Sequence, residues 1–346
     1  MDDAALETLF LPLANGGAAV PASGRVLFLR ARAGEGLTRF RAAHPSLPID
    51  CEQSFRPLAQ ALEREGLRCA DERRTGYAMV LVLPPRQRDE ARATLAAAVA
   101  RCAPGGLVVV SVTNNEGARS SAADLASLMG GIETSSKHRC RVFWSRADAE
   151  RIDAARLADW RRLDEPRRIG DGRFVSRPGL FSWDRIDAGS ALLAEHLPRD
   201  LAGHGADLGC GYGYLAAEVL ARAPEVRALD LYEAEARALD LARINLQAGR
   251  AVPLGFLWHD VAAGLVGSYD FIVTNPPFHH GRADQPEIGR AFITAAAGAL
   301  RPGGRLFLVA NRHLPYEATL ATHLRDVHKR DERDGYKVLE GIKGVS

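Results

Sequence analysis

The segment Ala206-Asp207-Leu208-Gly209-Cys210-Gly211-Tyr212-Gly213-Tyr214-Leu215 reads as a short strand, a glycine-rich turn and the start of an alanine-rich helix. Glycines let a backbone approach a ligand closely, and the first N–H groups of a helix can bind an anionic group such as a carboxylate. Tyr214 stands where a dinucleotide-binding G-x-G-x-x-G turn needs its third glycine, so a pyrophosphate site is not predicted. The segment predicts an α/β fold with a ligand at this strand end, and a tight loop without a ligand is the alternative.

A second informative stretch, Asn275-Pro276-Pro277-Phe278, closes the apolar, strand-like run Phe271-Ile272-Val273-Thr274. Two consecutive prolines fix φ and remove two backbone donors, so the carbonyls around them stay free to accept hydrogen bonds from a ligand's amino group. Asn275 adds a side-chain carbonyl, and Phe278 adds an apolar face on which a planar ring can lie. The stretch predicts a site for a planar amine, and a proline-rich loop with a buried Phe is the alternative.

Acidic residues follow the next two apolar segments. Glu233 comes 20 residues after Gly213 (233 − 213), at the end of the segment 226–232, where an acid can accept hydrogen bonds from both hydroxyls of a ribose. Asp230 is the competing residue, and an ordinary surface acid near a helix N-terminus is the alternative interpretation of Glu233. Asp260 follows the segment 254–257, where it is placed to receive an adenine amino group.

In this order and spacing, the residues from Asp207 to Gly213, Glu233, Asp260 and Asn275-Pro276-Pro277-Phe278-His279 resemble class I S-adenosylmethionine methyltransferases that act on exocyclic amino groups. The segments 177–190 and 309–316 are similar to the RsmC-like ribosomal RNA guanine-N2 methyltransferases. The likeness is close over residues 175–346 and concerns only the architecture in the first half. It implies methylation of the exocyclic N2 amino group of a guanine in 16S ribosomal RNA, with S-adenosyl-L-methionine as cofactor.

The resemblance also implies roles for individual residues. The catalytic residues would be Asn275, Pro276, Pro277 and Phe278. The residues expected to bind the cofactor are Asp207, Gly209, Cys210, Gly211, Gly213, Glu233, Asp260 and Asn275, with Phe181 and Asp187 in a segment that folds over it. In this mechanism the Asn275 side-chain oxygen and the Pro276 carbonyl accept the two amino hydrogens, and the nitrogen lone pair points at the methyl group.

Other functions remain open at this point. A 23S ribosomal RNA guanine-N2 methyltransferase is a close alternative. Methylation of a protein glutamine or of adenine N6 is a further one, although such enzymes usually carry Tyr at the position of Phe278. A non-enzymatic RNA-binding scaffold is the third, and the intact glycine turn, Glu233 and Asn275 argue against it.

The sequence also contains an internal repeat. The segment 77–85 aligns without gaps on 269–277, and in both copies a Pro-Gly-Gly turn, at 104–106 and 302–304, precedes an apolar strand. The last strands, 139–145 and 336–342, also correspond. We therefore expect two tandem Rossmann-like methyltransferase modules.

The first module is expected to be degenerate. Leu83 replaces the amide of Asn275, and Arg30 and Arg32 stand where a close backbone approach requires small residues. We expect residues 1–150 to form a methyltransferase-like domain without a cofactor site and residues 177–346 to form the catalytic domain.

Residues 151–176 are expected to be an arginine-rich linker. Arginine matches phosphate oxygens with two hydrogen bonds, so the linker is a candidate RNA contact, and a solvated helix with paired charges explains its composition equally well. The candidate RNA-binding residues are Arg161, Arg162, Arg167, Arg168, His279 and Arg312. His279 and His280 are more often solvated loop residues than catalytic ones.

Composition limits the remaining classes. The 346 residues suffice for two domains, and 47% hydrophobic with 25% charged residues is typical of a globular protein. The net charge of +2 means that any RNA site is a local patch. Five separated cysteines without a C-x-x-C pair predict neither disulfides nor a metal site. With no secretory signal or membrane span, we expect a cytoplasmic, monomeric protein that acts on ribosomal RNA or a ribosomal subunit.

Overall fold

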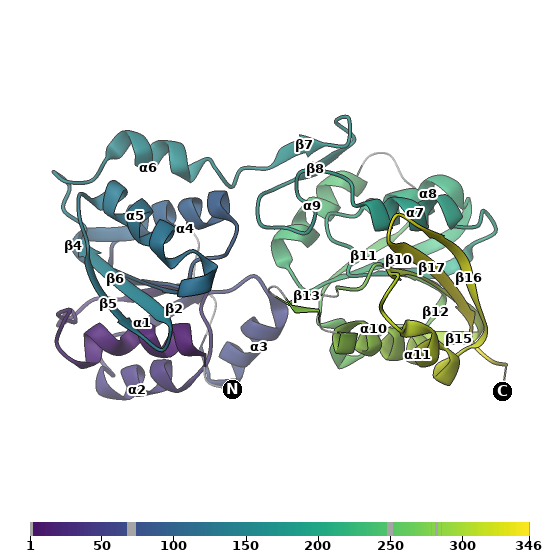
Figure 1. The fold of residues 1–346 in the computed structure, drawn as a ribbon, viewed down its shortest axis with the longest axis horizontal. Helices are drawn as coiled ribbons and strands as arrows, with labels where there is room; N and C mark the ends of the chain where they lie inside the picture. Colours follow the sequence, from purple (N-terminus) through teal and green to yellow (C-terminus); the bar gives the residue numbers. More distant parts are fainter. Residues whose placement is uncertain are drawn as a thin grey trace. The chain divides into compact units, whose positions relative to one another are not determined.

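The structure is a computed structural model that describes residues 3–67, 74–247, 252–277, 279–280, 283–284 and 286–345. Its chain divides into two compact units (Figure 1). Unit 1 comprises Met1–Pro166 with Arg177–Gly179, and unit 2 comprises Arg167–Ser176 with Leu180–Ser346. The stretch 151–176, which the sequence suggested as a linker, is thus shared between the two units.

Unit 1 is built on one sheet, which has six strands in the described residues in the order β2-β1-β3-β4-β6-β5. The first four are parallel, β6 runs antiparallel to them, and β5 pairs antiparallel with β6. The strands are β1 (Val26–Leu29), β2 (Ile49–Glu52), β3 (Tyr77–Val82), β4 (Cys102–Thr113), β5 (Glu133–Lys137) and β6 (Cys140–Arg146). The helices are α1 (Ala4–Ala14), α2 (Glu35–Ala43), α3 (Arg56–Arg64), α4 (Arg88–Arg101), α5 (Ala118–Met129) and α6 (Ala154–Arg161), with a short 3₁₀ turn at Asn114–Glu116.

Unit 2 repeats this design with an additional parallel strand. In the part of the chain that is described, its main sheet runs β11-β10-β9-β12-β15-β17-β16, and β17 is antiparallel to both of its neighbours, β15 and β16. The strands are β9 (Ala202–Leu208), β10 (Glu225–Glu233), β11 (Leu254–Trp258), β12 (Tyr269–Thr274), β15 (Leu300–Asn311), β16 (Arg325–Arg333) and β17 (Tyr336–Ile342). The helices are α7 (Ala188–His196), α8 (Tyr214–Arg222), α9 (Ala236–Leu246), α10 (Pro286–Ala299) and α11 (Tyr316–His323), with a 3₁₀ turn η2 (Val261–Ala263). Two small hairpins pair β7 (Arg167–Ile169) with β8 (Phe174–Ser176) and β13 (His279–His280) with β14 (Ala283–Asp284).

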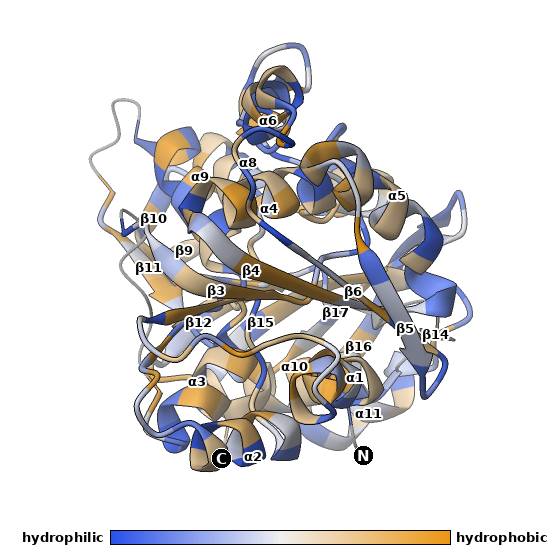
Figure 2. Ribbon diagram, turned by 90° about the vertical axis from the view of Figure 1, so that its left-hand side faces the viewer, coloured by the Kyte–Doolittle hydropathy of each residue, from blue (hydrophilic) through white to orange (hydrophobic). Residues whose placement is uncertain are grey.

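The core of unit 2 lies on both faces of its sheet because its central strands are apolar on both sides. Phe271 and Val273 of β12 pack with helices α7, α8 and α9, whereas the intervening Ile272 packs with α10 and α11. This alternation follows from the two-residue period of a strand. In unit 1 the central strands β3 and β4 are likewise hydrophobic, while β5 is hydrophilic and exposed (Figure 2). Both units are therefore sheets covered by helices on both faces, which confirms the predicted α/β fold with two Rossmann-like modules.

The internal repeat is visible in the backbone. Strands β3 and β4 of unit 1 correspond to β12 and β15 of unit 2, and both pairs shift register after the first tyrosine, Tyr77 or Tyr269. The prediction of a turn at each Pro-Gly-Gly was wrong, because these residues lie within β4 and β15. Gly105 and Gly303 have φ of 74° and 78°, which lets the strand bulge and continue.

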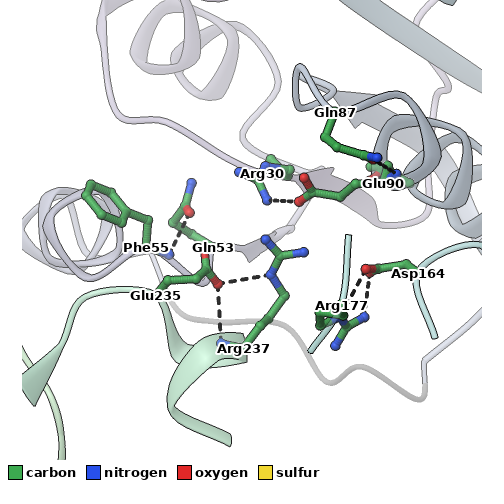
Figure 3. A network of polar contacts seen from close by, with 10 residues as sticks. Arg30, Gln53, Phe55, Gln87, Glu90, Asp164, Arg177, Glu235 and Arg237 are labelled. Atoms are coloured by element: carbon green, nitrogen blue, oxygen red, sulfur yellow. Dashed lines mark hydrogen bonds and ion pairs between the residues drawn. The ribbon is translucent and has the colours of Figure 1, made fainter. Parts of the chain in front are cut away.

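Most arginines of the stretch 151–176 are exposed, and acidic side chains neutralise part of their charge. Asp164 binds the Arg177 guanidinium with both carboxylate oxygens (Figure 3), and Arg162 lies 3.8 Å from Glu165. Interleaved acids thus form the charge pairs that the second interpretation of this stretch expected. Among the described residues, every helix is too short or too polar to span a lipid bilayer.

Candidate active site at the switch point of the unit 2 sheet

The predicted motifs of unit 2 meet at one edge of the sheet. Strand order reverses between β9 and β12, and parallel α/β sheets bind ligands at the carboxyl ends of the strands beside such a switch point. The glycine turn follows β9, Glu233 ends β10, Asp260 follows β11 and Asn275 follows β12. A Cβ atom built on Gly209 would lie 3.9 Å from the Asn275 carbonyl oxygen, so the glycine turn and the Pro-Pro corner are neighbours.

The glycine turn is held in place by the end of β10. The backbone N–H groups of Gly209 and Cys210 both donate to the Tyr232 carbonyl, at 2.9 and 3.1 Å. Gly209, Gly211 and Gly213 have φ of 69°, 54° and 92°, a region that side chains rarely tolerate. Burial raises the pKa of the Cys210 thiol well above its usual value, so this cysteine is a neutral packing residue within the turn.

Asp207 lies beneath the turn and is completely buried. Its Oδ2 accepts a hydrogen bond from the Ala216 backbone N–H at 3.0 Å, which ties β9 to the first turn of α8. Its Oδ1 has no partner among the described residues. Burial, with a smaller contribution from the charge of Glu233, raises the pKa of Asp207 to about 7. Buried polar atoms in folded proteins nearly always have a partner, so the unpaired oxygen marks Asp207 as a residue that calls for a functional explanation.

Glu233 closes the turn from the neighbouring strand. Its Oε2 accepts from the Gly211 N–H at 2.8 Å, and its Oε1 accepts from the Glu235 N–H at 2.9 Å. Burial raises its pKa, although these two N–H groups favour the ionised form. Asp260 begins η2 and accepts from the Ala262 N–H at 3.0 Å.

The competing acid Asp230 lies three residues back along β10, in a different network. It accepts a hydrogen bond from the Tyr269 hydroxyl at 2.9 Å and lies 3.0 Å from His204. Glu233, and not Asp230, therefore lies at the edge with the glycine turn.

The Pro-Pro corner carries acceptors that protein donors leave open. The Thr274 hydroxyl donates to the Leu208 carbonyl at 2.8 Å, which fixes the end of β12 against β9. The Asn275 Nδ2 donates to Asp187 Oδ2 at 2.9 Å and to Ser190 Oγ at 2.8 Å. Within the described chain, neither Asn275 Oδ1 nor the Pro276 carbonyl accepts a hydrogen bond. Phe278 and the side chains of His279 and His280 lie outside the described residues.

The segment before α7 holds two of the residues that are expected to contact the cofactor. Phe181 is 60% exposed, and Asp187 forms the N-cap of α7 while it contacts Asn275. Ser190 was missed by the sequence analysis. The Asp-x-x-Ser pattern predicts a helix cap, but nothing in it predicts contact with a residue 85 positions later.

The candidate RNA-binding arginines do not form one cluster within a unit. Arg161 and Arg162 belong to unit 1, and Arg167, Arg168 and Arg312 belong to unit 2. All five are exposed. Arg168 donates to the Gly172 carbonyl, and the Arg167 guanidinium lies 5.5 Å from the ring centre of Trp183.

The equivalent edge of unit 1 is built from other residues. Strand registers place Phe28 at the position of Asp207 and Gln53 at that of Glu233. Gln53 donates to the Ala31 carbonyl at 2.8 Å and accepts from the Phe55 N–H at 2.9 Å (Figure 3), so an uncharged amide takes the place of the carboxylate.

A charged pair also occupies this edge of unit 1. Arg30 stands at the position of Gly209, has a φ of 54°, and pairs with the buried Glu90 at 2.8 Å (Figure 3). In the described residues of unit 1, Phe28, Gln53 and Arg30 thus stand where unit 2 has Asp207, Glu233 and Gly209.

Known proteins are similar to this chain in sequence and in fold. Residues 171–340 match the family model "Methyltransferase small domain". Proteins named "Ribosomal RNA small subunit methyltransferase C" are similar to this chain: that of Shewanella halifaxensis is 34% identical over 69% of this chain and 70% of its own length. That of Pseudomonas paraeruginosa is 32% identical, over 76% and 78%.

A solved structure is similar over nearly the whole chain. It is the T. thermophilus 16S rRNA N2 G1207 methyltransferase (RsmC) in complex with AdoMet and guanosine. The two chains are 26% identical with a TM-score of 0.81, and the match covers 99% of this chain and 92% of that one. These comparisons confirm the family resemblance inferred from the sequence.

Proposed function

The chain belongs to the ribosomal RNA small subunit methyltransferase C family, and we propose that it methylates the exocyclic N2 amino group of a guanine in 16S ribosomal RNA, using S-adenosyl-L-methionine. One observation carries this proposal. The Asn275 Oδ1 and the Pro276 carbonyl, two acceptors without a protein donor in the described chain, lie beside the glycine turn at the switch point of the sheet.

The residues at this edge fit a cationic methyl donor. Three acidic residues lie at this edge: Asp207, Glu233 and Asp260. The buried Asp207 Oδ1 has no partner in the described chain. When bound, S-adenosylmethionine supplies a methyl group activated by its positively charged sulfur. We assign Gly209, Cys210, Gly211 and Gly213 to close backbone contact with it, Glu233 to its ribose and Asp260 to its adenine amino group.

The corner residues act on the target amine. The lone pair of guanine N2 is delocalised into the ring, which makes the amine a poor nucleophile. Asn275 Oδ1 and the Pro276 carbonyl accept its two hydrogens, which orients the lone pair and stabilises positive charge as it develops on nitrogen. Pro277 supports this role because it offers no competing N–H donor.

RNA has to present the guanine outside its helix. A base must be unpaired or flipped out before its exocyclic amine reaches such a corner, and we assign Phe278 to stacking on it. We keep Arg161, Arg162, Arg167, Arg168, His279 and Arg312 as candidate phosphate contacts, because arginine pairs well with phosphate oxygens.

Radiolabelled S-adenosylmethionine incubated with ribosomal subunits and free ribosomal RNA from a strain lacking this protein tests the proposal. We expect label in small-subunit RNA, at N2 of a guanine identified by nuclease digestion and mass spectrometry. Label in 23S RNA, in adenine N6 or in a protein would identify one of the alternative functions instead.

Asn275→Ala tests the assignment of the acceptor. We expect cofactor affinity within a few-fold of the native value, because the amide faces the amine, and a fall in kcat of about 100-fold or more, the scale of losing an orienting contact. Isothermal titration measures the cofactor affinity, and single-turnover kinetics measure the rate of turnover. Turnover within a few-fold of the native value would contradict the role of this side chain.

A further inference from the structure

The amide of Asn275 is held by two acceptors from a segment far away in the sequence. Asp187 Oδ2 lies 2.9 Å and Ser190 Oγ lies 2.8 Å from the Asn275 Nδ2. An amide nitrogen carries two hydrogens, so both find a partner. An ionised carboxylate only accepts hydrogen bonds, and it therefore fixes the nitrogen, rather than the oxygen, of Asn275 on its side.

Asp187 itself is fixed by helix α7. The same Oδ2 accepts from the Ser190 backbone N–H at 2.8 Å and so caps the helix. Ser190 is buried, and Gly189 packs so closely on Tyr336 of β17 that an added Cβ would lie 2.8 Å from its ring. The helix start is thus seated on the sheet, and it holds both acceptors in a defined place.

We propose that Asp187 and Ser190 are positioning residues, which set the orientation of the Asn275 amide so that its Oδ1 faces the target amine. This proposal rests on the function proposed above. The two orientations of an asparagine amide have nearly the same shape, so hydrogen bonds decide between them. The reversed orientation would place Oδ1 against the Asp187 carboxylate and aim two N–H donors at an amine that also donates.

The position of Asp187 in the fold gives it a role besides the cofactor contact that the family resemblance implied. Asp187 contacts Asn275, the residue to which we assign the substrate amine. Its effect should appear in kcat, with little effect on cofactor affinity.

A reciprocal exchange of the two side chains tests the proposal. Asn275→Asp brings two carboxylates together, and we expect kcat to fall about 100-fold or more. Adding Asp187→Asn restores a donor and acceptor pair in the reverse direction and leaves one oxygen of the new carboxylate at position 275 for the amine. We expect the double variant to regain about 10-fold or more over Asn275→Asp.

Ser190→Ala gives an independent test in two backgrounds. We expect kcat to fall about 3- to 10-fold in the native protein and to change little when Asn275→Ala is already present, because the two residues act through one contact. Cofactor affinity by isothermal titration should stay within about two-fold. The matched control is Asp3→Asn, another aspartate that caps a helix, here α1 of unit 1, and it should leave the kinetics unchanged.

Several results would overturn the proposal. One such result is an Asn275→Asp/Asp187→Asn double variant no more active than Asn275→Asp, and another is an equal effect of Ser190→Ala in both backgrounds. Either would show that Asp187 and Ser190 only cap helix α7 and do not position Asn275. Native turnover in Asn275→Ala would instead contradict the proposed role of Asn275 itself.

If the variants fold poorly, the native protein still decides the question. With ¹⁵N-labelled asparagine, both hydrogens of the Asn275 side-chain amide should exchange slowly with solvent, because Asp187 and Ser190 accept them. Rapid solvent exchange of both hydrogens would exclude this fixed orientation.

Discussion

At the scale of single residues, Asp207 places a carboxylate where water does not reach it. Burial raises its pKa to about 7, whereas an aspartate in an unfolded chain has a pKa of about 3.9. A group that holds its proton more tightly in the folded state stabilises the fold at low pH, and this contribution disappears as the pH rises through the folded pKa. In the ligand-free protein, the contribution of Asp207 to the free energy of unfolding should therefore fall between about pH 4 and pH 7.

Asp207→Asn should remove that dependence. The amide oxygen still accepts from the Ala216 N–H, but no charge has to be buried above pH 7. We expect the variant to exceed the native protein in free energy of unfolding at pH 8, by on the order of a few kcal/mol, and to match it near pH 4. Urea unfolding of the ligand-free proteins across this range measures the difference. Asp240→Asn, at an exposed position of α9, is the control, and parallel pH profiles for Asp207→Asn and the native protein would contradict the prediction.

At the scale of elements, the glycine turn couples β9 to helices α8 and α9. Gly213 begins α8 with a φ of 92°, and a Cβ there would lie 3.2 Å from Leu246 and 3.3 Å from Ala242 of α9. The glycine is thus required twice, for the backbone angle and for the close approach of the two helices.

Gly213→Ala should therefore do more damage than a glycine substitution elsewhere. Gly303 shares the left-handed backbone, with a φ of 78°, but a Cβ there meets nothing within 4 Å. We expect Gly303→Ala to cost about 1 kcal/mol of stability with cofactor affinity unchanged. Gly213→Ala should cost about 2–4 kcal/mol and weaken cofactor binding, since it also overpacks the helix contact. Thermal unfolding measures the stability of each variant, and isothermal titration measures its cofactor affinity. Equal losses in the two variants would contradict the role of the contact with α9.

Sequence patterns predicted these elements because their signals are local. The glycine turn, the apolar run before Asn275 and the repeated strand segments are each short, continuous stretches, and all three appear in the fold as expected. The contact of Asn275 with Asp187 and Ser190 joins residues 88 and 85 positions apart, and no local pattern encodes such a pairing. The bulges at Gly105 and Gly303 were taken for turns because glycine with positive φ serves both structures.

At the scale of the whole molecule, two copies of one architecture have diverged at one edge of the sheet. Toward the opposite ends of the strands, the two copies keep the same hydrogen-bond network. In unit 1, Tyr77 donates to Asp50, which also pairs with Arg25. In unit 2, Tyr269 donates to Asp230, which lies beside His204. Strand registers place these residues at equivalent positions. The structural network was retained in both copies, and the acidic ligand edge only in unit 2.

We infer from this contrast that the chain binds one molecule of S-adenosylmethionine, in unit 2. Glu233→Gln gives unit 2 the side-chain type that unit 1 carries at Gln53, and replacing a charged acceptor by a neutral one should weaken binding about 10- to 100-fold. The reverse exchange, Gln53→Glu, should create no second site, because Phe28 and Arg30 still occupy the equivalents of Asp207 and Gly209. Isothermal titration of the native chain and both variants gives the affinity and the stoichiometry. Binding of two equivalents by the native chain would show that unit 1 also binds the cofactor. Full affinity in Glu233→Gln would show that Glu233 does not contact the cofactor.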